Sequence, residues 1–128
     1  MELYTYRIVS VDRIVDGDTV DLTIDLGFCT TVKWRFRMDG YDAPEIWRPI
    51  TKAEYDGAVL VTKELESLLK NSELYLKSSK YPEIYARWGA TIFYKDSRGD
   101  LVSINDLMIK FINDGNLTKS DLRAIPDK

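Results

Sequence analysis

The feature that most constrains the fold is a strict alternation of apolar and polar residues between positions 19 and 38. In the first half the apolar members are Val20, Leu22, Ile24 and Leu26. In the second half they are Val32, Trp34, Phe36 and Met38. Side chains two residues apart share one face of an extended chain. The pattern therefore predicts strands over 19–26 and 28–38, turned at Gly27, each with one face in the core.

Further strands are predicted over residues 3–12, 73–77 and 88–95, where β-branched and aromatic residues are frequent, with a short extended piece at 101–102. Thr51 and Glu54 have the spacing of a capping box at the start of a helix that runs to about Lys70. Gly57 inside that helix indicates close packing or a kink. Ser103 is expected to cap a second helix that ends near Gly115.

This order of elements predicts an α+β fold, mainly β: a five-stranded OB-type barrel with two helices. A chain of 128 residues is the size of one domain. We expect residues 1–118 to form that domain. Residues 119–128 carry little apolar pattern, so we expect a short, loosely held C-terminal tail.

The composition excludes several kinds of chemistry. The chain has no histidine and a single cysteine, Cys29. A Cys/His zinc site, an intramolecular disulfide and any nucleophile activated by histidine are therefore excluded. Acid–base chemistry is left to carboxylates, tyrosines, lysines or a metal-bound water.

No apolar run approaches the length of a membrane helix, and the first residues show no signal-peptide pattern. We therefore expect a cytoplasmic protein with no membrane association. A monomer is the expected oligomeric state.

Two acidic turns stand out from this background. The first contains Asp16 and Asp18, and the second contains Asp39, Asp42 and Glu45. Either turn alone reads as an ordinary loop. The predicted strands between them would bring Asp18 and Asp42 to one end of the barrel, where like charges repel unless a cation neutralises them.

Oxygen ligands at this barrel end suit Ca²⁺, a hard cation that tolerates irregular geometry. Pro44 favours an extended conformation at Ala43, which could aim the carbonyl of Ala43 at the same cation. Arg37 and Arg87 would each read as solvated cations, unless both converge on a phosphate beside the metal. The combination predicts a metal-dependent phosphodiesterase.

Three motifs together resemble the staphylococcal-nuclease-like (thermonuclease) family of OB-fold nucleases. They are Val15-Asp16-Gly17-Asp18-Thr19-Val20, Arg37-x4-Asp42-Ala43-Pro44-Glu45 and Tyr85-Ala86-Arg87. The resemblance covers roughly residues 7–117. It implies a Ca²⁺-dependent endonuclease that cleaves DNA or RNA at the 5′ P–O bond and leaves 3′-phosphates.

The resemblance also implies a role for each matching residue. The calcium ligands would be Asp18, Asp42 and the carbonyl of Ala43, with Asp16 and Thr19 supporting them. Glu45 would position or deprotonate the attacking water, while Arg37 and Arg87 would grip the scissile phosphate. Tyr85 would form a wall of the nucleotide pocket.

Two other functions remain open at this point. The barrel could be a non-catalytic OB-fold module that binds nucleic acid or protein, or a calcium-stabilised interaction domain. The nuclease hypothesis is preferred because the predicted metal ligands, Glu45 and both arginines are all present. Its expected partners are single-stranded or denatured DNA and RNA.

Overall fold

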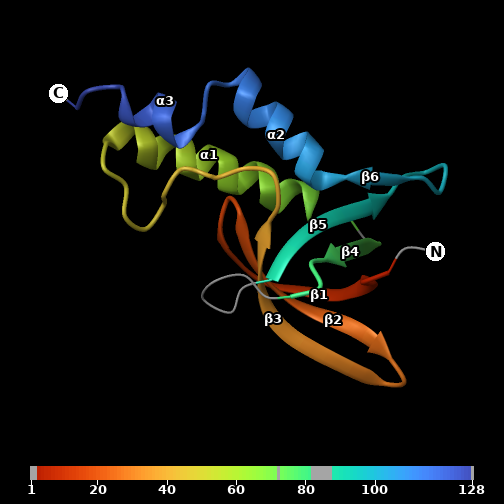
Figure 1. The fold of residues 1–128 in the computed structure, drawn as a ribbon. Coiled ribbons are helices and arrows are strands. Elements are labelled where there is room, and N and C mark those ends of the chain that lie inside the picture. The colour runs from red at the N-terminus through yellow and green to blue at the C-terminus, as the bar shows by residue number, and fades with distance from the viewer. Residues whose placement is uncertain (1–2, 72, 82–87, 128) are drawn as a thin grey trace.

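The computed structural model describes residues 3–71, 73–81 and 88–127. The barrel strands are β1 (Thr5–Asp16), β2 (Thr19–Gly27), β3 (Thr30–Met38), β4 (Leu74–Ser78) and β5 (Trp88–Lys95). A short strand, β6 (Leu101–Ser103), extends the sheet beyond β5. The helices are α1 (Lys52–Leu68), α2 (Ile104–Asp114) and α3 (Lys119–Arg123). Figure 1 shows the three helices gathered on one side of the barrel.

The barrel is closed by a pairing between β3 and β5. The order is β3-β2-β1-β4-β5-β6, and β3 also pairs in parallel with β5. In that pairing Phe36 lies opposite Trp88, and Met38 lies opposite Ala90. The α+β, mainly β, five-stranded OB-type barrel predicted from the sequence is confirmed.

Strand β1 is the longest, at 12 residues, and it pairs with both β2 and β4. Its register with β2 shifts at three places along the strand. Irregularities of this kind bend a strand and increase its local twist. The bending lets β1 follow the wall of the barrel as far as the turn that contains Gly17.

The hydrophobic core fills the barrel and the space under α1 and α2. The predicted inward face is confirmed at Val20, Leu22 and Ile24, which are almost completely buried. Leu26 and Trp34 remain 43% and 44% exposed, against expectation. Leu26 lies beside the turn of the β2–β3 hairpin, whereas Trp34 lies opposite the buried Leu22. Both line a hollow in the barrel wall, which leaves their side chains partly uncovered.

The turn of this hairpin also differs from expectation. Phe28 and Cys29 were expected in the strand, but they form the two-residue connection, with φ values of 54° and 59°. A tight hairpin turn of this kind needs positive φ at both central residues. Turn geometry therefore overrides the strand preference of these side chains, and β3 begins at Thr30.

The predicted helix starts are confirmed. The hydroxyl of Thr51 accepts a hydrogen bond from the amide of Glu54 at 3.0 Å, and Ser103 caps α2 in the same way. The reciprocal half of the capping box is not formed. The carboxylate of Glu54 instead accepts hydrogen bonds from the amides of Ile50 and Glu45.

The C-terminal segment is more ordered than expected. Within residues 119–128, for which the sequence predicts a loose tail, Lys119–Arg123 forms α3, capped by Thr118. Leu122 is buried against Gly57 of α1, which confirms the close packing predicted at that glycine. Too few apolar residues surround Leu122 to produce a helical pattern, so this docking left no periodic signal.

Candidate active site

The two acidic turns meet at one end of the barrel. Oδ2 of Asp18 accepts a hydrogen bond from the amide of Ala43 at 2.9 Å, across 25 positions of the chain. The hydroxyl of Tyr41 donates to the carbonyl of Gly17 at 2.8 Å, and the indole of Trp47 donates to the carbonyl of Val15 at 2.9 Å. The β1–β2 turn and the loop after β3 are therefore joined directly.

Gly17 makes this close approach possible. A β-carbon at Gly17 would stand 2.5 Å from Cγ1 of Val61 and 2.9 Å from Cβ of Ala43. Real side chains do not tolerate such distances, so only glycine lets the first turn lie against both α1 and the second loop. The packing of the turn sets the position of Asp18.

The loop after β3 is anchored where it leaves the barrel. The buried side chain of Asn105 on α2 donates to the carbonyl oxygens of Asp39 and Ala90 and accepts from the amide of Ile92. Each of these distances is between 2.8 and 2.9 Å. Nothing in the sequence pattern pointed to Asn105, because a lone asparagine in a helix is usually exposed.

Arg37 lies between the two predicted metal ligands. Its guanidinium contacts the carboxylate of Asp42 directly and lies 4.0 Å from Oδ2 of Asp18. It also donates to the carbonyl of Tyr41 at 3.4 Å. Asp42 is 71% exposed, whereas Asp18 is only 13% exposed. A positive charge therefore already bridges the acids of the two turns.

The first turn is electrostatically crowded. Burial raises the pKa of Asp16 to about 7, and the carboxylates of Asp18 and Glu45 add to this shift. Burial acts in the same direction on Asp18, but hydrogen bonds from Asp16, Ala43 and Thr19 and the nearby Arg37 hold its pKa below the ordinary value. The hydroxyl of Thr19 donates to Oδ1 of Asp18 at 2.9 Å. Asp18 is therefore the ionised member of the pair.

Glu45 lies farther along the same loop and has a different partner. Its Oε1 is 3.3 Å from the ammonium of Lys119 on α3. Its amide donates to Oε2 of Glu54 at 3.0 Å. Glu45 contributes to the electrostatic shift at Asp16, so it belongs to the same acidic region. Neither Lys119 nor Glu54 was identified as a site residue from the sequence.

The predicted ligands provide oxygen atoms, which is the type of ligand that calcium binds. Asp18 and Asp42 offer carboxylate oxygens, the ligand type that Ca²⁺ prefers, and the bridging guanidinium of Arg37 marks the place between them as one that accommodates a cation. Within residues 3–71, 73–81 and 88–127, no group of three or more Asp, Glu, His or Cys side chains is arranged to hold a metal ion. The predicted set has two carboxylates, so its remaining ligands would be backbone carbonyls and water.

Two predicted residues cannot be placed. Arg87 and Tyr85 lie outside the described residues, so their relation to Arg37 and the acidic turns stays a prediction. The structure brings together Asp16, Asp18, Thr19, Arg37, Asp42 and Ala43. Glu45 lies in the same loop, two residues after Ala43.

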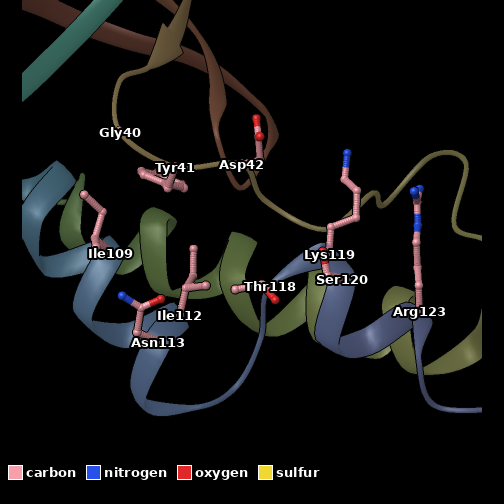
Figure 2. A pocket seen from close by; sticks show the side chains of 10 residues that line it. All are labelled: Gly40, Tyr41, Asp42, Ile109, Ile112, Asn113, Thr118, Lys119, Ser120 and Arg123. Atoms are coloured by element: carbon pink, nitrogen blue, oxygen red, sulfur yellow. The ribbon is translucent and has the colours of Figure 1, made fainter.

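A pocket of about 450 Å³ opens beside this region (Figure 2). One side is formed by the loop at Gly40, Tyr41 and Asp42, and the other by α2 and α3. Lys119 and Arg123 contribute its cations. The pocket is wide enough for a small ligand or part of a chain molecule.

Comparison of the chain with protein-family models and with curated proteins finds no match. Among the described helices, none is both long and apolar enough to cross a membrane.

Proposed function

We propose that this protein is a calcium-dependent endonuclease of the staphylococcal-nuclease-like kind. It would hydrolyse phosphodiester bonds of DNA or RNA at the 5′ P–O bond and leave 3′-phosphates. The observation that carries the proposal is the junction of the two acidic turns, with Arg37 lying between Asp18 and Asp42. An acidic cluster with an arginine at its centre fits a metal ion and a phosphate that share one site.

Asp18, Asp42 and the carbonyl of Ala43 would hold the calcium ion, with Asp16 and Thr19 in support. When bound, calcium would neutralise negative charge on the phosphate that is attacked. Thr19 keeps one oxygen of Asp18 oriented through its 2.9 Å hydrogen bond. The amide of Ala43 orients the other oxygen.

Arg37 would bind the scissile phosphate. A guanidinium can donate two parallel hydrogen bonds to phosphate oxygens, and its charge offsets the charge that develops in the transition state. In the structure the same guanidinium contacts Asp42. Substrate binding would therefore require Arg37 to exchange a carboxylate partner for phosphate oxygens. Arg87 would supply the second guanidinium.

Glu45 would accept the proton of the attacking water. The chain has no histidine, so a carboxylate near the phosphate is the natural general base. Glu45 is 38% exposed, so water can reach it. Its ion pair with Lys119 leaves the second carboxylate oxygen for the water.

The test is cleavage of heat-denatured DNA in Ca²⁺, in Mg²⁺ and in chelator, with Glu45→Gln as the matched variant. We expect cleavage in Ca²⁺, no cleavage in chelator, and a large loss of cleavage activity in Glu45→Gln. Intact DNA under every condition would contradict the proposal. Cleavage at the wild-type rate by Glu45→Gln would show that another group is the base.

One observation favours a second candidate, a non-catalytic OB-fold module. A hollow of about 300 Å³ in the barrel wall is lined by aromatic residues, among them Tyr6, Trp34 and Trp88, with Lys80 nearby. Trp34 and Trp88 pack edge to face, with ring centroids 6.1 Å apart. Aromatic rings with a nearby cation can stack the bases of a single strand. Oligonucleotide binding without cleavage, in Ca²⁺ and in chelator alike, would support this function.

A further inference from the structure

Glu54 connects the first turn of α1 to both ends of the segment 45–50. The Glu54 residue is completely buried. Its Oε2 accepts a hydrogen bond from the amide of Glu45 at 3.0 Å, and its Oε1 accepts one from the amide of Ile50 at 2.8 Å. A single carboxylate therefore holds the backbone on either side of this segment. Glu45, the proposed base, is at its first position.

Arg123 of α3 supplies the counter-charge. Its Nε donates to Oε1 of Glu54 at 2.9 Å. A buried carboxylate is tolerated only when it is paired and hydrogen-bonded. Burial alone would raise the pKa of Glu54, but the hydrogen bonds from Arg123, Ile50 and Glu45 hold it below the ordinary value. Glu54 is therefore ionised at neutral pH.

The same helix also reaches the side chain of Glu45. Lys119 lies one turn before Arg123, and both side chains extend from α3 in the same direction (Figure 2). The ammonium of Lys119 is 3.3 Å from Oε1 of Glu45. The backbone of Glu45 is thus held from α1, and its carboxylate is held from α3.

We propose that Glu54, with Arg123 as its counter-ion, is a positioning residue for Glu45. Glu54 does not touch the substrate; it fixes the place from which the Glu45 carboxylate meets the attacking water. This inference rests on the proposed function, because the placement of Glu45 affects a rate only if Glu45 takes part in the reaction. Small displacements of a reacting group can cost about 100-fold in rate.

A purely structural role for Glu54 makes a different prediction. Loss of a buried ion pair would lower stability under either role. Only a positioning role lowers kcat in protein that is still folded, while KM is unchanged. Only a direct hold on the segment 45–50 exposes the amides of Glu45 and Ile50 to hydrogen exchange while the barrel stays protected.

The experiment compares Glu54→Gln and Arg123→Gln with the wild type. Glutamine preserves the volume of Glu54, but it lacks the charge and presents an NH₂ group to a site that contains only donors. Cleavage of denatured DNA in Ca²⁺ is measured at a temperature where each variant is folded. We expect kcat to fall by about 10- to 100-fold with KM unchanged in both variants. We also expect the amides of Glu45 and Ile50 to lose protection from exchange.

Two further variants separate position from stability. Leu74→Ala removes a buried side chain of β4, where Leu74 pairs with Tyr94 of β5, so it should lower the melting temperature and leave kcat unchanged. Arg123→Lys keeps the charge and should recover part of the kcat lost in Arg123→Gln. If Glu54→Gln does not fold, Arg123→Gln still gives the result, because Arg123 is partly exposed.

The outcomes distinguish this inference from the proposed function. If Glu54→Gln and Arg123→Gln keep the wild-type kcat while Glu45→Gln is inactive, only the positioning role is overturned. Unchanged protection of the Glu45 and Ile50 amides in Glu54→Gln also overturns it. A wild-type protein that does not cleave, or a fully active Glu45→Gln, overturns the proposed role of Glu45 and the positioning role with it.

Discussion

Leu122 of α3 lies directly against Gly57 of α1, so that a β-carbon at Gly57 would collide with Cδ1 of Leu122. The contact docks α3 onto the helix that starts after the site loop. The cations that pair with Glu45 and Glu54, which are Lys119 and Arg123, both belong to α3. Because Gly57 has no side chain, α3 can pack against α1 and hold Lys119 and Arg123 beside Glu45 and Glu54.

Gly57→Ala is predicted to destabilise the protein, although alanine is the better helix former. Alanine would gain about 1 kcal/mol of helix propensity. Overpacking against Leu122 should cost about 1–3 kcal/mol. Urea unfolding would measure the free energy of unfolding, and we expect a net loss.

Two variants check the origin of this loss. Ser67→Ala, on the exposed side of α1, should show a smaller gain in helix propensity with no collision. Gly57→Ala in a Leu122→Ala background should cost less than in the wild type, because the colliding side chain is gone. A Gly57→Ala protein more stable than the wild type would contradict the packing argument.

Arg37→Gln is predicted to bind Ca²⁺ more tightly in the absence of substrate and yet to cleave more slowly. Its guanidinium now neutralises Asp18 and Asp42, so it competes with a metal ion for the same carboxylates. Loss of the phosphate contact should lower kcat by about 100- to 1,000-fold. Isothermal titration with CaCl₂ and a cleavage assay would measure the two effects.

Arg35→Gln is the matched control. Arg35 lies on the same strand but forms a two-point ion pair with Asp21, at 2.8 and 3.1 Å, on an exposed face. Its removal should leave calcium affinity and kcat near the wild-type values. Weaker calcium binding by Arg37→Gln would show that the guanidinium does not compete with the metal.

The stability of the protein should depend on Glu54 in acid. The pKa of Glu54 is lower in the folded protein than in the unfolded chain. Its contribution is therefore fully present above the unfolded pKa of about 4.3 and is lost as the pH falls through the folded pKa. We expect Glu54→Gln to flatten the fall in unfolding free energy below about pH 4.5. An exposed replacement on α1, Glu66→Gln, should leave that fall in place, and an identical acid slope in Glu54→Gln would contradict the assignment.

The barrel could be predicted because its signals are local. Alternation over residues 19–38 and the caps at Thr51 and Ser103 each depend on a few neighbouring residues. The exposure of Trp34 could not be predicted in this way, because alternation specifies a face of the strand and not whether other side chains cover that position.

The arrangement of the candidate site was predicted in part. Spacing and turn residues indicated that Asp18, Ala43 and Asp42 would come together, and the structure joins them. The supports from Glu54, Arg123, Lys119 and Asn105 were missed. Each of these contacts links residues far apart in the chain, and a charged residue at a helix end has the same sequence signal whether it is solvated or buried.

The proposed nuclease activity is tested most directly by the chemistry of the ends of the cleaved strands. Denatured DNA treated with the protein in Ca²⁺ would be analysed for 3′-phosphate and 3′-hydroxyl ends. Cleavage at the 5′ P–O bond gives fragments with 3′-phosphates and 5′-hydroxyls, and we expect these fragments only with Ca²⁺ and not with Glu45→Gln. Fragments with 3′-hydroxyls, or no fragments at all, would contradict the proposal.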